Sequence, residues 1–264
     1  MKHRLAVTLA VTAGLAVSAA AGLASSARRG STVASRPIAG VAMKKAPVTT
    51  TTPPPAVVDP PKGTILLATI TKPTPDYSAP FTKGSPKPAG IVPIRWHSSV
   101  VSLPVIGQKP GWLDVRLPQR PNGLTAWIRS TAPTLSYTGY SIVINVTTMH
   151  LSLYLRGIRI MYAPAGVGTP LLPTPTGNFF IAYFAQPPSS GYGPFVIVTS
   201  AHSNFITDWE ASGDAEIGIH GPLGMDVAIG TTGARVSHGC VRLHVSDLAQ
   251  LRDVPLGTPV TIIT

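Results

Sequence analysis

The stretch IGIHG, residues 217–221, followed by SHGCVR, residues 237–242, brings two histidines and a cysteine together with glycines. The apolar run 217–219 predicts a short buried strand with His220 at its end, where the backbone fixes the direction of the side chain. Cys240 is the only cysteine among the 264 residues, so neither an internal disulfide nor a multi-thiolate zinc site can form. The glycines around this single thiol favour a catalytic nucleophile over a small buried apolar side chain.

A thiol needs help to react near neutral pH, because a free cysteine has a pKa of about 8.5 and is mostly protonated there. His220 or His238 could accept the proton, and we favour His220. His238 stands two residues before the thiol, a spacing at which side chains point the same way but meet poorly. Gly239 permits a sharp turn, so we expect the amides of Gly239 and Cys240 to converge on the oxygen of a tetrahedral intermediate.

Two further residues of this stretch are candidate substrate-binding residues, Ser237 and Arg242. A guanidinium can hold a substrate carboxylate through two parallel hydrogen bonds. Arg242 could instead form a surface ion pair with Asp247.

Short apolar runs separated by turn residues continue on both sides of the motif and predict strands of about five residues. The 28 prolines and 25 glycines argue against long helices. One short helix is expected after an N-cap at Ser246. We therefore predict a mainly β chain, with a small barrel-like domain before a β-rich catalytic domain that has few short helices. The predicted strands are 64–70, 100–106, 112–117, 124–128, 141–146, 151–155, 179–184, 195–199, 217–219 and 259–263.

The N-terminal region predicts export. Residues 1–27 combine an early basic pair with an uncharged, Ala-rich stretch and small residues, the pattern of a secretory signal peptide. An uncleaved signal would be the only expected membrane contact. Residues 28–61 include TTTTPPP and predict an extended Thr/Pro-rich linker.

The net charge of +11 is unevenly distributed. Residues 62–135 carry nine basic and two acidic residues, whereas residues 136–264 carry five and seven. The basic residues form neither an Arg-rich helix nor an aromatic platform, so nucleic-acid binding is not expected. Attraction to an anionic cell-wall polymer fits this charge.

The segment 103–130 pairs a Pro-Gly turn and a Trp-Leu-Asp-Val strand with a Pro-Asn-Gly hairpin turn. It resembles the Src-homology-3-like domain of bacterial wall enzymes. The resemblance implies a wall-associated domain over residues 62–135.

The spacing His220-Gly221, 15 residues, then SHGCVR resembles the signature of the L,D-transpeptidase (YkuD) family. The upstream segments AGVG and TPTGNF and the terminal LGTPV resemble other parts of that family. The resemblance implies a catalytic domain over residues 136–264, with Cys240 as nucleophile, His220 as base and the Gly221 carbonyl orienting the imidazole. It further implies His238 with Gly239 at the oxyanion site.

The function implied is that of an exported cell-wall L,D-transpeptidase acting on peptidoglycan stem peptides, without cofactor or metal, and acylated by carbapenems. Arg242 stands where several members carry Asn. Transfer of the same thioester to water would instead give an L,D-carboxypeptidase.

Two functions without acyl transfer also fit parts of the sequence. The first is a non-catalytic wall-binding module that uses the basic N-terminal domain. The second is a zinc-binding module, for which His-Gly-Cys spacing is poor. Its ligands would be His220, His238, Cys240 and His244. The remaining histidines are expected to be surface or strand residues: His97, His150 and His202.

Overall fold

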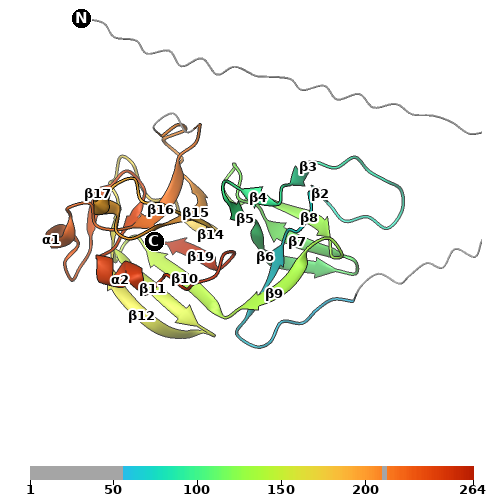
Figure 1. The fold of residues 1–264 in the computed structure, drawn as a ribbon, viewed down its shortest axis with the longest axis horizontal. Helices are drawn as coiled ribbons and strands as arrows, with labels where there is room; N and C mark the ends of the chain where they lie inside the picture. The colour runs from blue at the N-terminus through green and yellow to red at the C-terminus, as the bar shows by residue number, and fades with distance from the viewer. Residues whose placement is uncertain (1–55, 210–212) are drawn as a thin grey trace, which may run out of the picture. The chain divides into compact units, whose positions relative to one another are not determined.

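The computed structural model describes residues 56–209 and 213–264, which belong to one compact unit. The predicted signal peptide, residues 1–27, and most of the predicted linker, residues 28–61, lie outside the described residues. Strands dominate the described part of the chain and the helices are few and short, so the prediction of a mainly β fold is confirmed (Figure 1). No helix in these two ranges is long and apolar enough to cross a membrane.

The N-terminal strands form a five-stranded antiparallel sheet in the order β8-β7-β6-β1-β9. Two further antiparallel pairs, β2 with β3 and β4 with β5, lie between β1 and β6 in sequence. The sheet confirms the four strands predicted in this region, and its likeness to a Src-homology-3-like domain remains a prediction. The strands are β1 (Ile65–Thr69), β2 (Thr74–Asp76), β3 (Gly90–Val92), β4 (Arg95–Trp96), β5 (Ser99–Val100), β6 (Ser102–Lys109), β7 (Trp112–Arg116), β8 (Thr125–Arg129) and β9 (Thr134–Thr138).

The following strands form a ten-stranded sheet in the order β12-β11-β10-β19-β14-β15-β16-β18-β13-β17. All six strands predicted here are confirmed, within about two residues at most ends and three at one. The strands are β10 (Tyr140–Asn145), β11 (His150–Leu155), β12 (Ile158–Pro164), β13 (Gly166–Gly168), β14 (Gly177–Ala185), β15 (Val196–His202), β16 (Glu216–His220), β17 (Ala234–Ser237), β18 (Val241–Arg242) and β19 (Pro259–Ile263).

The strand β19 lies in the interior of the larger sheet although it comes last in the sequence of strands. It pairs in parallel with β10 and antiparallel with β14, and Figure 1 shows it in red between those two strands. Val260 and Ile262 are buried on one face of β19, as expected for a strand with alternating apolar residues.

Three short helical segments interrupt the strands: η1 (Ser190–Tyr192), α1 (Asp226–Ile229) and α2 (Val245–Ala249). The prediction of an N-cap at Ser246 is wrong, because α2 has its N-cap at His244 and includes Ser246. The Leu248 side chain is buried, as the predicted apolar helix face requires. The helix α1 escapes prediction from the sequence, since its single turn has no side-chain N-cap.

The strand β14 contributes apolar side chains to both hydrophobic cores. Phe179 and Ile181 belong to the core of the larger sheet, while Phe180 and Ala182 pack with the buried residues of the N-terminal sheet. Because side chains alternate across a strand, one strand can serve two cores in this way. The two sheets therefore share apolar packing through β14.

A polar junction beside this packing joins the loop between β7 and β8 to the end of β15 and the segment that follows it. The Arg120 guanidinium donates to Asp214 Oδ1 at 2.8 Å and to two backbone carbonyls. Asn122 exchanges hydrogen bonds with the backbone of His202 at 2.7 and 2.8 Å. The His202 ring is fully buried, with Nε2 2.7 Å from the Pro118 carbonyl and Nδ1 2.8 Å from Asp214 Oδ2.

We predict that Phe180→Ala lowers the free energy of unfolding by about 3–5 kcal/mol, because it removes a fully buried ring from the shared packing. Urea denaturation followed by tryptophan fluorescence would measure the loss. Leu171→Ala is the control, because Leu171 is 84% exposed and should change stability by less than about 0.5 kcal/mol. Equal losses in the two variants would contradict the assignment of Phe180 to the core.

Candidate active site

A cleft of about 560 Å³ gathers most of the residues that the sequence singled out. The two predicted glycines, Gly221 and Gly239, are chain neighbours of residues on its wall. Aromatic and acidic residues from outside the sequence motif complete the wall. The predicted residues on the wall are His220, Ser237, His238, Cys240 and Arg242. The additional ones include Trp96, His97, Tyr183, Tyr192, Trp209, Asp214 and Glu216.

The Cys240 thiol lies against the middle of β16. The strands β16 and β18 pair in parallel with Ile219 opposite Val241, which places Cys240 beside Gly218. The Gly218 N–H donates to Cys240 Sγ at 3.4 Å. A Cβ atom at position 218 would lie 3.8 Å from the sulfur and 3.7 Å from the His220 ring. The imidazole and the thiol therefore approach the same point on β16.

The His220 imidazole is held by the residue that follows it. His220 Nδ1 lies 2.8 Å from the Gly221 carbonyl oxygen, so Nδ1 carries the proton and Nε2 is left as an acceptor. The Tyr192 ring packs on the imidazole with the ring centres 4.6 Å apart. Position 221 must be glycine because a Cβ there would lie 2.7 Å from the Tyr192 carbonyl carbon. The backbone around His220 thus restricts both its tautomer and its orientation.

The electrostatics of the site keep the imidazole neutral. Burial lowers the pKa of His220 to about 4, and the positive charge of Arg242 acts in the same direction, against the opposing effect of the Gly221 hydrogen bond. Burial raises the pKa of the Cys240 thiol, while the Gly218 N–H and Arg242 act in the opposite direction. At neutral pH the resting pair is consequently an uncharged imidazole beside a protonated thiol.

The turn that presents the thiol is stabilised by hydroxyl groups. Gly239 has a φ of 127°, a conformation open to glycine, as the sharp turn requires. The Ser237 hydroxyl accepts the Gly239 N–H at 3.1 Å and donates to the Cys240 carbonyl at 2.5 Å. Thr174 donates to the Gly239 carbonyl at 2.7 Å. Ser237 thus has a structural part in the turn, and its role in binding substrate remains a prediction.

Arg242 lies on the cleft wall with its Nε atom buried and without a hydrogen-bond partner among residues 56–209 and 213–264. The expectation of an ion pair with Asp247 is wrong, since no ion pair joins these two described residues. A buried, unpaired guanidinium nitrogen beside a nucleophile is suited to receive an anionic group of a substrate.

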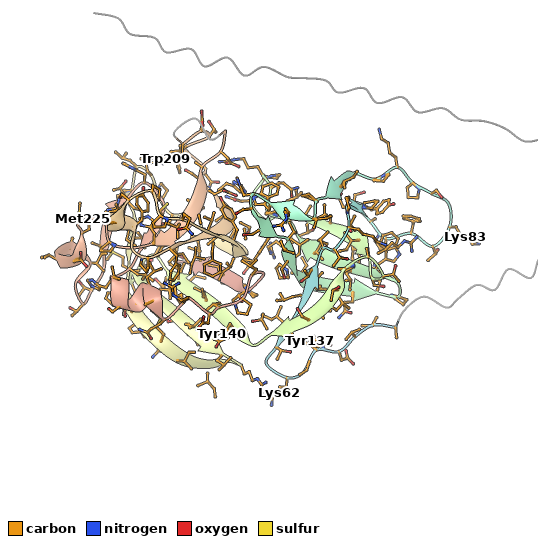
Figure 2. The ribbon with its side chains drawn as sticks, viewed as in Figure 1. Lys62, Lys83, Tyr137, Tyr140, Trp209 and Met225 are labelled. Carbon is orange, nitrogen blue, oxygen red and sulfur yellow. The ribbon has the colours of Figure 1, made fainter. Side chains whose placement is uncertain are left out.

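His238 and His244 lie in different surroundings. The exposed His238 ring packs near Trp209, which Figure 2 labels, with the ring centres 5.6 Å apart. His244 instead contacts Asp226 at 3.2 Å. Within the described ranges no three His, Cys, Asp or Glu side chains converge as metal ligands would. The four candidate zinc ligands, all of them described, therefore do not form a ligand cluster.

Part of the cleft wall comes from outside the motif and carries no signal in the local sequence. His97 lies in the turn between β4 and β5, with a φ of 50°, and reaches Glu216 at the start of β16. Trp96 joins the same carboxylate across 120 positions of the sequence. The predicted strand, residues 217–219, stops short of Glu216, and only extending its alternation by one residue could have indicated that Glu216 shares a face with Gly218 and His220.

Comparison with known proteins identifies the family. The family model described as L,D-transpeptidase catalytic domain (YkuD) matches residues 139–262. A Bacillus subtilis protein named "Putative L,D-transpeptidase YkuD" is 32% identical over 144 residues, which cover 53% of this chain and 77% of that protein. The chain belongs to the YkuD family of L,D-transpeptidase catalytic domains.

A protein of the same name from Bacillus licheniformis is 30% identical over 124 residues, which cover 47% of this chain and 65% of that protein. Among solved structures, an L,D-transpeptidase from Mycobacterium smegmatis is similar with a TM-score of 0.38 and 17% identity, over 61% of this chain and 82% of that one. The catalytic domain of the Enterococcus faecium L,D-transpeptidase is similar with a TM-score of 0.35 and 23% identity, over 47% and 96%.

We predict that Arg242→Gln slows alkylation of Cys240 by iodoacetamide severalfold at pH 8. Removing the guanidinium raises the thiol pKa further, so less thiolate is present. The pH profile of the alkylation rate, followed by intact mass, would measure the shift. Arg159→Gln is the charge-matched control on the exposed surface of β12, and Arg242→Lys should retain part of the wild-type rate. An unchanged profile in Arg242→Gln would contradict an electrostatic influence of Arg242 on the thiol.

Proposed function

We propose that this chain is a cell-wall L,D-transpeptidase that forms an acyl-thioester on Cys240 from a peptidoglycan stem peptide. The acyl group then passes to an amine, either cross-linking two stem peptides or attaching a protein. The observation that carries the proposal is the contact of the thiol with β16, where Gly218 donates to the sulfur and the buried His220 imidazole lies beside it. Membership of the family supports a transferase activity on the cell wall.

In the proposed first step the Cys240 sulfur attacks the carbonyl carbon of the amide that follows a diaminopimelate-type residue. The C–S bond forms while His220 Nε2 takes the thiol proton. The C–N bond then breaks, and the leaving amine of D-alanine receives that proton from the imidazolium. Because His220 is neutral and the thiol protonated at rest, proton transfer accompanies the attack rather than preceding it.

The developing oxyanion needs hydrogen-bond donors that do not already donate to another group. The Gly239 N–H already donates to Ser237 Oγ, so we assign the oxyanion to the Cys240 amide and the His238 side chain. The Nε atom of Arg242 has no hydrogen-bond partner among the described residues. We therefore assign Arg242 to bind the side-chain carboxylate of the diaminopimelate-type residue.

The proposal includes the organisation inferred from the sequence. Residues 1–27 direct export, residues 28–61 form a spacer, residues 62–135 form a wall-associated Src-homology-3-like domain and residues 136–264 form the catalytic domain. The enzyme would then act outside the cytoplasm, where peptidoglycan and other anionic wall polymers are found. The proposed reaction requires no cofactor.

Mass spectrometry of the purified protein tests the nucleophile. Incubation with a disaccharide-tetrapeptide should add the mass of the disaccharide-tripeptide acyl group, and incubation with a carbapenem should add the mass of the drug. Cys240→Ala and Cys240→Ser should show neither adduct while remaining folded, because the change removes the nucleophile and little packing. An adduct in either variant would refute the thioester on Cys240. Release of the free tripeptide product with no transfer to any amine would indicate an L,D-carboxypeptidase.

The pH dependence of acylation tests the role of His220. An imidazole accepts a proton only in its neutral form, so acylation should stay nearly constant from pH 7 to 5 and fall as pH approaches about 4. His220→Ala should reduce the acylation rate about 10²- to 10⁴-fold. Stopped-flow quenching of tryptophan fluorescence by a carbapenem would measure both. A fall centred near pH 6.5 in the wild type would contradict a buried, neutral His220.

A further inference from the structure

The strand β16 presents three successive outward positions to the cleft: Glu216, Gly218 and His220. The intervening residues Ile217 and Ile219 belong to the hydrophobic core. Alternate residues of a strand lie about 6.6–6.8 Å apart, and the Cys240 sulfur contacts the middle position. The thiol therefore contacts the strand position that lies between those of His220 and Glu216, and all three side chains line the same cleft.

The Glu216 carboxylate is held by groups that carry no permanent positive charge. Trp96 Nε1 donates to Oε1 at 3.0 Å and the Tyr183 hydroxyl donates to Oε2 at 2.5 Å. His97 Nε2 lies 3.5 Å from Oε2 and supplies a positive charge only when protonated. Burial and the charge of Glu216 raise the pKa of Tyr183, which keeps the proton on the phenol. In the described part of the chain no Lys or Arg pairs with Glu216.

Asp214, two positions before Glu216, has the permanent cationic partner that Glu216 lacks. Asp214 is paired with the Arg120 guanidinium at 2.8 Å and with the His202 ring at 2.8 Å. Glu216 has a side chain only 13% exposed, and a carboxylate this buried normally has a cationic partner. Its Oε1 accepts from Trp96 alone among the described residues, whereas a carboxylate oxygen can accept two hydrogen bonds. A cation entering the cleft would complete this arrangement.

We propose that Glu216 is a specificity-determining residue that binds the positively charged amine of the acyl acceptor. This role rests on the proposed function. The cleft then has two charged ends. At one end Arg242, which is opposite His220 in the register of β16 and β18, binds the carboxylate of the acyl donor. At the other end Glu216 binds the ammonium group of the acceptor. Since Glu216 and His220 flank, along β16, the Gly218 that contacts the thiol, an acceptor bound at Glu216 can approach the thioester without displacing the base.

In the transfer step the acceptor nitrogen loses two protons. The bound ammonium releases one proton to solvent, and the neutral amine attacks the thioester carbonyl carbon. The C–N bond forms and the C–S bond breaks, while the nitrogen loses a second proton and the sulfur regains one through His220. Water and hydroxylamine are uncharged at neutral pH and gain nothing from Glu216. The carboxylate thus favours transfer to an amine over hydrolysis.

Partition of a preformed thioester tests the role. The acylated enzyme is offered a tripeptide with a side-chain amine, hydroxylamine or water, and the products are quantified by mass spectrometry. Glu216→Gln should reduce transfer to the tripeptide amine about 10- to 100-fold, the range expected when a charged hydrogen bond is lost. Transfer to hydroxylamine and water should change less than about twofold, because no Coulomb attraction to Glu216 is involved. Glu216→Asp should recover part of the amine transfer.

Asp226→Asn is the control, because it removes a negative charge from an exposed site on α1 that does not line the cleft. Asp226→Asn should leave the rates of transfer to the tripeptide amine, to hydroxylamine and to water unchanged. Wild-type enzyme gives a second measurement that needs no variant: added salt should slow transfer to the tripeptide amine and leave hydroxylamine transfer unchanged. If Glu216→Gln does not fold, this salt dependence tests the charge-based selection of the acceptor without a variant.

Equal losses for all three acceptors in Glu216→Gln would show a structural role and overturn the proposal. Unchanged amine transfer in that variant, or amine transfer insensitive to salt, would overturn it as well. In these cases the thioester still forms, so the proposed function survives. Wild-type enzyme that forms no thioester from the tetrapeptide would instead overturn the proposed function and the role of Glu216 with it.

Discussion

The site depends on the contact between the thiol and the backbone at the centre of β16. Position 218 has no Cβ, and one placed there would lie 3.2 Å from a Val196 methyl group as well as close to the sulfur. The Cys240 thiol lies beside this position and accepts the backbone N–H of Gly218. A strand that donates its own amide to a nucleophile orients the sulfur by a hydrogen bond from rigid backbone rather than from a mobile side chain. Strand alternation then puts residues 216 and 220 on the cleft face, and their own hydrogen bonds orient the carboxylate and the imidazole.

The charged groups of the cleft, Arg242 on β18 and Glu216 on β16, are separate from the uncharged pair that reacts. Burial disfavours charge on both members of the His220–Cys240 pair, so the reacting centre is neutral at rest. Fixed charges lie at its margins, on Arg242 and Glu216. In a cleft with apolar walls such charges act over longer distances than they would in water. The arrangement leaves the centre free for chemistry while the margins select substrates by charge.

Much of the fold and the centre of the site could be predicted from the sequence, because both rest on local patterns. Alternating apolar residues marked the strands, and glycines beside His220 and Cys240 marked the motif. The occupied amide of Gly239 could not be foreseen, since Ser237 reaches it only through the geometry of the turn. Glu216 was missed because its partners are Tyr183 on β14 and the hairpin of β4 and β5, about 120 positions away, and no local pattern encodes such long-range contacts. The N-terminal hairpin therefore has a part in the site that only the tertiary structure reveals.

The interior position of β19 makes the continuity of the larger sheet depend on this strand. The strands of the N-terminal sheet are all made once β9 is complete, although Phe180 and Ala182 of β14 complete its core. The larger sheet, in contrast, exists as two unconnected halves, ending at β10 and at β14, until β19 is made. Each half meanwhile has an open edge that can pair with a foreign strand. A chain in which β19 has not yet paired would thus expose two unpaired edges, at β10 and at β14.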